Sequence, residues 1–211
     1  MNLLPQDVAG YIRSLCDRFD DPILLEMEAL AAERRFPIVE RVVGVNLEIL
    51  ARSVGARRVF ELGSGFGFSA WWFARAVGAG GEVTLTDGDP ENTAMSRGFL
   101  TRAGLAQRCT FVTGDAVAAL AATDGEFDVV YCDIDKTGYP AAFAAAAERL
   151  RVGGLYICDN VLWSGKVADP SNAEAETEAI RQHNAAVYND PRFLPAINPT
   201  RDGVIVALRI G

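Results

Sequence analysis

Acidic and amide side chains follow two apolar runs in the second half of the chain. Asp133 follows the first run, and Asp159 and Asn160 follow the second. If both runs are parallel strands of one sheet, their carboxyl ends lie at the same edge and these side chains converge. Carboxylate and amide oxygens are the ligands that Mg²⁺ prefers. The pattern therefore favours a magnesium site whose remaining positions can take two oxygens of a chelating substrate and a water. The alternative is that these three residues only cap helices and form turns.

A lysine stands three residues after the first of these acids. The chain has 20 basic residues, and only two of them, Lys136 and Lys166, are lysines. A lysine can give up its proton in a partly desolvated site and act as a base, whereas an arginine stays protonated. Lys136 is therefore the candidate general base; a solvated lysine placed there by chance is the alternative.

A glycine-rich segment, Glu61-Leu-Gly-Ser-Gly-Phe-Gly-Phe-Ser69, follows another apolar run. Glycines at such a strand end allow a tight turn, and the helix that follows offers free N–H groups to a ligand. The dinucleotide pattern needs its third glycine at position 68, which is Phe68. The acid two residues before Gly63 would repel a pyrophosphate but suits a cationic ligand such as S-adenosylmethionine. A purely structural turn is the alternative.

Two further strand ends carry acids that could contact a nucleoside. Asp87 can accept hydrogen bonds from both ribose hydroxyls, whereas Asp89, directly before Pro90, is expected to cap a helix. Asp115 and Ala116 are placed for the adenine edge, but Asp115 could equally be a helix cap. Both interpretations of Asp115 stay open from the residues alone.

These residues need a sheet that brings the strand ends together. Strands alternate with helices after residue 57, which indicates parallel βαβ units. The last two strands are too close for a crossover helix, so one of them should run antiparallel. The expected strands are 58–62, 82–86, 109–113, 127–132, 154–158, 193–197 and 203–209.

The first fifty-odd residues show only helical spacing. Pro22 and Pro37 are each expected to open a helix, the second with Ile38, Val42, Val45 and Ile49 on one face. The sequence predicts a single α/β domain, with residues 1–55 as a helical extension and 56–211 as the core. His183 lies in a late polar helix and is expected at the surface.

Composition and charge indicate which binding partners and which cellular compartment to expect. The chain has 211 residues, is 50% hydrophobic and carries a net charge of −8, so a nucleic-acid partner or an anionic membrane surface is disfavoured. The stretch 62–74 is the longest without a charge and is too short to span a bilayer. Residues 1–10 do not resemble a signal peptide, and four scattered cysteines suggest buried free thiols. We expect a cytoplasmic protein.

Taken together, these motifs resemble those of the metal-dependent O-methyltransferases, the group that includes catechol and caffeoyl-CoA O-methyltransferases. The resemblance extends from about Pro37 to Arg209. It rests on the glycine segment and on four further motifs: Gly114-Asp-Ala116, Asp133-Ile-Asp-Lys-x-x-Tyr139, Leu150-Arg-x-Gly-Gly154 and Asp159-Asn-Val-Leu-Trp163. It implies a Rossmann-like fold with a seven-stranded, mostly parallel sheet, helices on both faces and an antiparallel terminal strand.

The resemblance also implies roles for individual residues. It makes Lys136 the catalytic base, and it places Trp163 near the acceptor. The implied ligands of Mg²⁺ or another divalent cation are Asp133, Asp159 and Asn160. The residues implied to line the S-adenosylmethionine site are Val39, Glu61, Gly63, Ser64, Ser69, Asp87, Ala116 and Asp135, beside Asp115 of the adenine motif. A small aromatic acceptor with two adjacent hydroxyls and a homodimer complete the expectation.

Three positions depart from the family pattern: Phe66, Gly88 and Ile134. None removes an expected ligand, but they bear on the shape of the adenine pocket. The enzymatic alternative is a nicotinamide-dependent dehydrogenase, which would share the fold and the acid at position 87. A catalytically silent S-adenosylmethionine-binding protein is the non-enzymatic alternative. A base-modifying methyltransferase would be expected to carry an Asn-Pro-Pro-aromatic stretch, which this sequence lacks.

Overall fold

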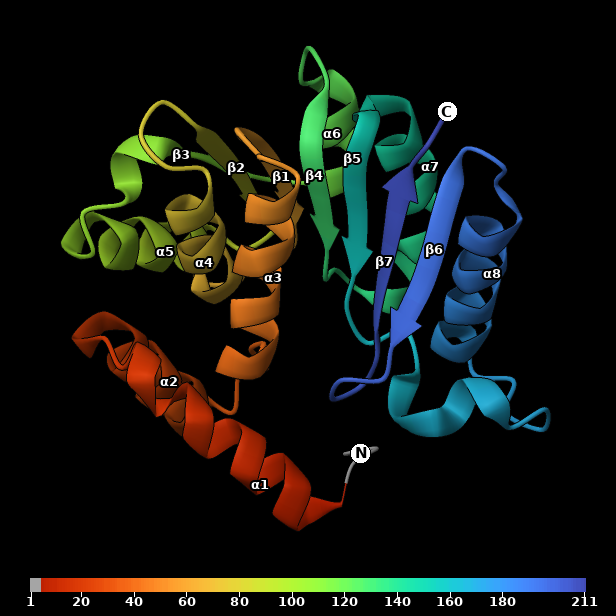
Figure 1. The fold of residues 1–211 in the computed structure, drawn as a ribbon, viewed down its shortest axis with the longest axis horizontal. Coiled ribbons are helices and arrows are strands. Elements are labelled where there is room, and N and C mark those ends of the chain that lie inside the picture. Colours follow the sequence, from red (N-terminus) through yellow and green to blue (C-terminus); the bar gives the residue numbers. More distant parts are fainter. Residues whose placement is uncertain (1–4) are drawn as a thin grey trace.

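Seven strands form one sheet, in the order β3-β2-β1-β4-β5-β7-β6, in the computed structural model, which describes residues 5–211 (Figure 1). Only β7 runs against the other six, because it pairs antiparallel with both β5 and β6. This confirms the expected mixed sheet with an antiparallel terminal strand. The strands are β1 (Arg58–Leu62), β2 (Glu82–Asp87), β3 (Cys109–Thr113), β4 (Phe127–Cys132), β5 (Leu150–Cys158), β6 (Phe193–Asn198) and β7 (Val204–Arg209).

Helices cover both faces of this sheet. One face is packed by α3, α4 and α5, with α2 against these helices, and the other face is packed by α6, α7 and α8 (Figure 1). The helices are α1 (Gln6–Ser14), α2 (Pro22–Arg34), α3 (Arg41–Ser53), α4 (Phe68–Ala76), α5 (Pro90–Arg102), α6 (Ala116–Ala122), α7 (Tyr139–Arg149) and α8 (Ala175–Asn189). Short 3₁₀ turns span Leu15–Phe19, Ala106–Arg108, Lys136–Gly138 and Trp163–Ala168.

The apolar strands are buried on both sides because their side chains alternate between two cores. In β4, Val129 and Tyr131 join the core beneath α3 and α4, whereas Val130 and Cys132 join the core beneath α6 and α7. Both cores hold the strands in register, so the carboxyl ends of β1, β2, β4 and β5 share one edge. That edge carries the predicted site residues.

The N-terminal region is helical, as expected, but one boundary and one face differ. Asp21 caps α2 and accepts a hydrogen bond from Ile23 N. The prediction that Pro37 opens a helix is wrong, because the chain stays extended until α3 begins at Arg41. Packing decides the buried face of α3: it consists of Val43, Gly44, Leu47 and Ala51, and Ile49 is exposed.

No helix in residues 5–211 is long and apolar enough to cross a membrane. All four cysteines are free; Cys109 is half-buried and the other three are buried. Part of the N-terminal stretch that the sequence analysis compared with a signal peptide, residues 1–4, lies outside the described residues.

Candidate active site

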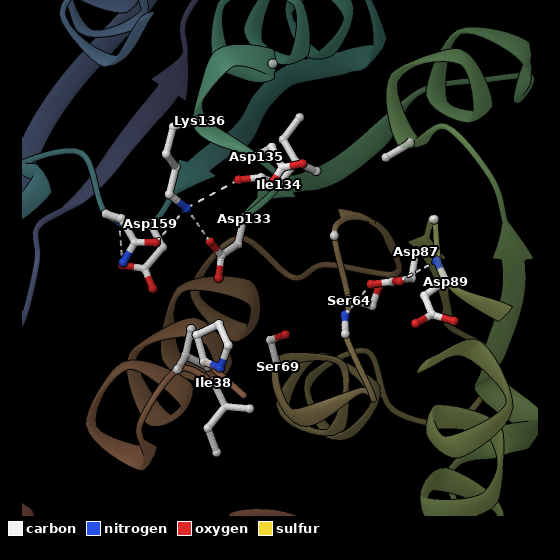
Figure 2. Close-up of a pocket in the computed structure, with 18 of the residues that line it drawn as sticks. Ile38, Ser64, Ser69, Asp87, Asp89, Asp133, Ile134, Asp135, Lys136 and Asp159 are labelled. Atoms are coloured by element: carbon white, nitrogen blue, oxygen red, sulfur yellow. Dashed lines mark hydrogen bonds and ion pairs between the residues drawn. The ribbon is translucent and has the colours of Figure 1, made fainter. Parts of the chain in front are cut away.

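A cavity of about 1350 Å³ opens at the shared edge of the sheet. Its walls come from the loops after β1, β2, β3, β4 and β5, and from the extended segment before α3. Figure 2 shows Asp87 and Asp89 on one side, and Asp159 and Lys136 on the other, with Ser69 and Asp133 between them. One continuous cavity therefore joins both groups of predicted residues.

Of the residues assigned to the metal, cofactor and acceptor sites from the sequence, all except Glu61 line this cavity. The residues that line it are Val39, Gly63, Ser64, Ser69, Asp87, Asp115, Ala116, Asp133, Asp135, Lys136, Asp159, Asn160 and Trp163.

The glycine loop after β1 is held tightly against its neighbours. Gly63 has a φ of 82°, and a Cβ there would lie 2.4 Å from the carbonyl oxygen of Asp133, so no other residue fits without moving the backbone. Gly65 N donates to a carboxylate oxygen of Asp87 at 2.9 Å. Ser64 Oγ accepts from Thr86 N at 3.1 Å. The loop is therefore bound to the end of β2 and lies beside the end of β4.

Glu61 lies behind the cavity wall. Its side chain is fully buried, and it accepts a hydrogen bond from Ser69 Oγ, which lines the cavity. Its second oxygen, Oε2, has no hydrogen-bond partner in the described chain. Burial raises the pKa of Glu61 to about 8, partly offset by hydrogen bonds from Ser69 and Ser64. Glu61 can thus act on a cavity ligand through Ser69.

The acids after β2 and β3 combine capping with exposure to the cavity. Asp89 caps α5 through Glu91 N at 2.8 Å, as expected. Asp115 caps α6 through Ala118 N at 2.7 Å and also lines the cavity, so its two interpretations are compatible. Asp87 accepts from Asp89 N as well as from the glycine loop, which fixes its carboxylate at the cavity wall.

Lys136 lies where the sequence analysis placed a base. Its Nζ donates to Asp133 Oδ1 at 3.0 Å, to Asn160 Oδ1 at 2.8 Å and to the carbonyl of Ile134 at 3.3 Å (Figure 2). The side chain is only 12% exposed. The ring centroids of Tyr139 and Trp163 lie 4.9 and 5.7 Å from Nζ. The amine is thus surrounded by oxygens and two aromatic faces, largely away from water.

Asp159 and Asn160 extend from the end of β5 into the same cluster. Asp159 is buried, and burial together with the charge of Asp133 raises its pKa above the usual range. Its carboxylate accepts from Asn160 N at 2.8 Å, and its carbonyl accepts from Tyr139 Oη at 2.8 Å. Asn160 has a left-handed φ of 57°, which asparagine tolerates better than most residues. Two acids and an amide oxygen therefore converge.

No group of three or more His, Cys, Asp and Glu side chains in residues 5–211 has the arrangement of a metal site. The cluster at β4 and β5 contains only two such side chains, and its third oxygen comes from Asn160. That composition matches the hard-oxygen ligand set expected for Mg²⁺.

The prediction that His183 lies at the surface is wrong. His183 is fully buried, because α8 turns the face containing Thr177, Ile180 and His183 toward the core. Its Nε2 lies 2.9 Å from Tyr156 Oη, and its Nδ1 lies 3.0 Å from Asn184 Oδ1. These partners satisfy the imidazole, so a polar residue is tolerated in the core.

His183 gives the folded protein a defined pH dependence. Burial lowers its pKa to about 4, whereas the unfolded chain protonates near pH 6.5. The unfolded state therefore takes up a proton first as the pH falls, and the free energy of unfolding should drop by about 2 kcal/mol between pH 7 and pH 5. Denaturant unfolding at both pH values measures the drop in the free energy of unfolding for wild type and for His183→Gln. The difference between the two drops is the contribution of His183. Because the chain has a single histidine, NMR titration of its imidazole provides a second measurement; protonation near pH 6.5 in the folded protein would contradict the prediction.

Several cavity residues escaped sequence reasoning. Those with large side chains include Phe36, Ile38, Glu176 and Arg201. Phe36 and Ile38 both precede α3, and Ile38 lies in the segment that was expected to be helical. Glu176 and Arg201 lie late in the chain without a local motif. Phe66, one of the departures from the family pattern, is buried against Phe36 with ring centroids 4.9 Å apart and does not line the cavity.

Comparisons with known proteins agree on one family. The family model described as O-methyltransferase matches residues 18–210. A catechol O-methyltransferase from Niastella koreensis is 33% identical over 87% of this chain and 86% of its own length. The O-methyltransferase from Bacillus cereus, solved in complex with SAH, has a TM-score of 0.81 and 29% identity over 90% of this chain and 91% of that chain. A methyltransferase from Geobacter sulfurreducens has a TM-score of 0.85 and 28% identity over 99% and 98% of the two chains.

Proposed function

The chain belongs to the O-methyltransferase family, and we propose that it moves the methyl group of S-adenosylmethionine to one hydroxyl of a small aromatic acceptor with two adjacent hydroxyls. The observation that carries this proposal is the position of Lys136. Its Nζ lies within hydrogen-bond distance of Asp133 and Asn160, at one end of a cavity whose other end is formed by the glycine loop and Asp87.

The charge of the cavity supports a cationic cofactor. Seven carboxylate side chains and two cationic side chains, Lys136 and Arg201, are among its lining residues in the described part of the chain. S-adenosylmethionine carries an ammonium and a sulfonium, whereas a dinucleotide carries a pyrophosphate that these acids would repel. The close approach of the loop at Gly63 and the fixed carboxylate of Asp87 fit a nucleoside bound across the ends of β1 and β2. Neither the cavity nor the family supports the nicotinamide alternative.

The oxygens of Asp133, Asp159 and Asn160 fit a divalent cation. Lys136 Nζ lies within hydrogen-bond distance of Asp133 and Asn160, so two of these three residues already turn their oxygens toward the cavity, which supports this proposal. A divalent cation bound there would favour ionisation of a hydroxyl held beside it. We propose Mg²⁺ or another hard divalent ion as the natural occupant.

The residues of this chain then have separable roles. Lys136, in its neutral form, accepts the hydroxyl proton at Nζ. The deprotonated oxygen then attacks the methyl carbon of S-adenosylmethionine, the bond between that carbon and sulfur breaks, and its electron pair stays on sulfur. Trp163 and Ile38 form apolar walls that hold an aromatic ring. Alignment of the two reactants removes much of the entropic barrier. Charge is neutralised as the methyl group moves, so a largely buried site favours the reaction.

Titration calorimetry and product analysis together test this function. S-adenosylmethionine should bind and NAD should not. With S-adenosylmethionine and Mg²⁺, catechol should give its monomethyl ether. Phenol should react at least about 10²-fold more slowly, because a single hydroxyl leaves one of the two acceptor positions beside the proposed cation unfilled. Binding of NAD without S-adenosylmethionine would refute the proposal, and equal rates for catechol and phenol would refute the acceptor class.

We further propose a cytoplasmic homodimer. The N-terminal helices leave several large apolar side chains exposed, including Val8, Tyr11 and Leu15, with Tyr11 65% exposed, and Ile49 of α3 is exposed as well. Apolar side chains gathered in this way favour a protein interface. The four free cysteines fit a reducing compartment. Sedimentation at micromolar concentration tests the dimer, and a monomer there would refute it.

A further inference from the structure

Arg201 is a cationic side chain in the cavity wall that the proposed reaction leaves unused. It lies in the turn between β6 and β7, with its side chain 34% exposed. Lys136, the other cationic lining residue among those described, is already bonded to Asp133 and Asn160. Arg201 is therefore the cationic group of the cavity that remains for a ligand.

The backbone fixes Arg201 close to the proposed acceptor position. The turn that carries it is bonded to the segment directly after Asn160: Val161 N donates to Gly203 O at 3.0 Å, and Leu162 N donates to Asp202 O at 2.9 Å. Arg201 itself has a left-handed φ of 53°, a conformation that an arginine adopts only when the surrounding structure imposes it. The backbone at Arg201 is thus held beside the Asn160–Trp163 turn, and its side chain reaches the wall at Ile38.

The charge of Arg201 is only partly balanced. Its Nε lies 3.5 Å from Glu40 Oε1, but the same carboxylate also accepts hydrogen bonds from Arg13, with Nε 3.2 Å from Oε2. Two guanidinium groups share the carboxylate of Glu40, and Arg201 also acts electrostatically on Asp159, partly lowering the pKa that burial raises. Arg201 Nη1 donates to the carbonyl of Ile38 at 3.1 Å, whereas Nη2 makes no hydrogen bond with residues 5–211. A pair of N–H donors therefore remains for a ligand.

We infer that Arg201 binds a carboxylate on the acceptor, so that the preferred substrate is an aromatic acid with two adjacent hydroxyls. This inference rests on the proposed function, because the hydroxyl pair must lie at Lys136 and the oxygen cluster. A guanidinium keeps its charge, and its free N–H groups form charge-assisted hydrogen bonds to a carboxylate. The ring between the two ends packs on Trp163. Two carboxylates lie in this part of the wall. Glu176 is exposed on the first turn of α8, where water screens its charge. Asp159 is buried and belongs to the proposed cation cluster.

The experiment compares 3,4-dihydroxybenzoate with its methyl ester, which keeps the ring and both hydroxyls but lacks the charge. Wild type should show a kcat/KM at least about tenfold higher for the acid. Arg201→Met should lower kcat/KM for the acid by about 10- to 100-fold, mainly through KM, since a hydrogen bond to a charged group has that effect. The same variant should leave the ester within about threefold. Arg201→Lys should restore part of the preference.

Two matched variants separate binding of the carboxylate from support of the cavity wall. Glu40→Gln removes the shared carboxylate but keeps Arg201, and it should strengthen the preference for the acid. Glu176→Gln should not weaken it. An equal loss of both activities in Arg201→Met would show that Arg201 only holds the segment at Ile38, which overturns the inference.

The remaining outcomes distinguish this inference from the function on which it rests. If wild type methylates the acid and the ester equally well and Arg201→Met changes neither, the inference fails and the proposed function stands. If wild type methylates neither compound although S-adenosylmethionine binds, the proposed acceptor class fails, and the inference fails with it.

Discussion

Lys136→Ala is expected to lower kcat for methyl transfer by about 10²–10⁴-fold, the usual effect of removing a positioned general base. Lys136 is the side chain that can take the hydroxyl proton, since its Nζ lies among Asp133, Asn160 and the face of Trp163. Affinity for S-adenosylmethionine should change little, because the expected nucleoside contacts lie at the ends of β1 and β2. Steady-state turnover assays measure kcat, and titration calorimetry measures the affinity for S-adenosylmethionine.

Lys136→Arg distinguishes a base from an ion-pair partner. A guanidinium could keep the contact with Asp133, so a purely electrostatic role would be largely restored. A base would not be restored, because arginine does not lose its proton at neutral pH, and we expect this variant to be nearly as slow as Lys136→Ala. The second lysine of the chain is the matched control: Lys166 pairs with Glu174 and is 42% exposed, so Lys166→Ala should retain activity. Full activity of Lys136→Arg on a catechol would contradict the role of base.

The sheet and the edge that carries the site were predictable from local pattern. The spans of β1, β3 and β4 agree with the expected ranges, because each strand ends directly before a glycine or an aspartate. Parallel pairing then brings Asp133 and Asp159 to one edge, which requires no knowledge of side-chain contacts. The cluster around Lys136 follows from these two facts.

Features decided by packing were not predictable in the same way. His183 sits in a helix with a polar sequence, and only the position of Tyr156 on β5 shows that its imidazole can be buried and satisfied. Proline at position 37 is compatible with a helix start, but in the structure Ile38 and Val39 are not helical and line the cavity wall.

Arg201 shows the same limitation at the functional site. Forty residues separate it from Asn160 in sequence, with α8 and β6 between them. It reaches the cavity because the turn before β7 is bonded to Val161 and Leu162. No spacing rule connects residues that meet only through a long-range hairpin, so sequence motifs indicate the reaction type and miss cavity residues such as Arg201.

Removal of divalent cations with EDTA is expected to abolish methyl transfer while leaving the binding of S-adenosylmethionine largely intact. Asp133 and Asp159 place two carboxylates together, and burial, followed by the charge of Asp133, raises the pKa of Asp159. Lys136 Nζ contacts two of the three proposed ligand residues, so the base lies directly beside the proposed cation site. Added Mg²⁺ should restore the rate, which a catechol assay with and without chelator measures.

Asp159→Ala should reproduce the effect of the chelator and resist rescue by Mg²⁺. We expect a loss of about 10³-fold or more, since a divalent cation contributes several kcal/mol to a reaction of this kind. Asp124→Asn is the matched control, because this exposed aspartate precedes β4 and so lies at the opposite edge of the sheet. Calorimetry with Mn²⁺ should show weakened cation binding in Asp159→Ala and unchanged binding in Asp124→Asn. Equal turnover of a catechol with and without EDTA would remove the cation from the mechanism and leave Lys136 to act alone.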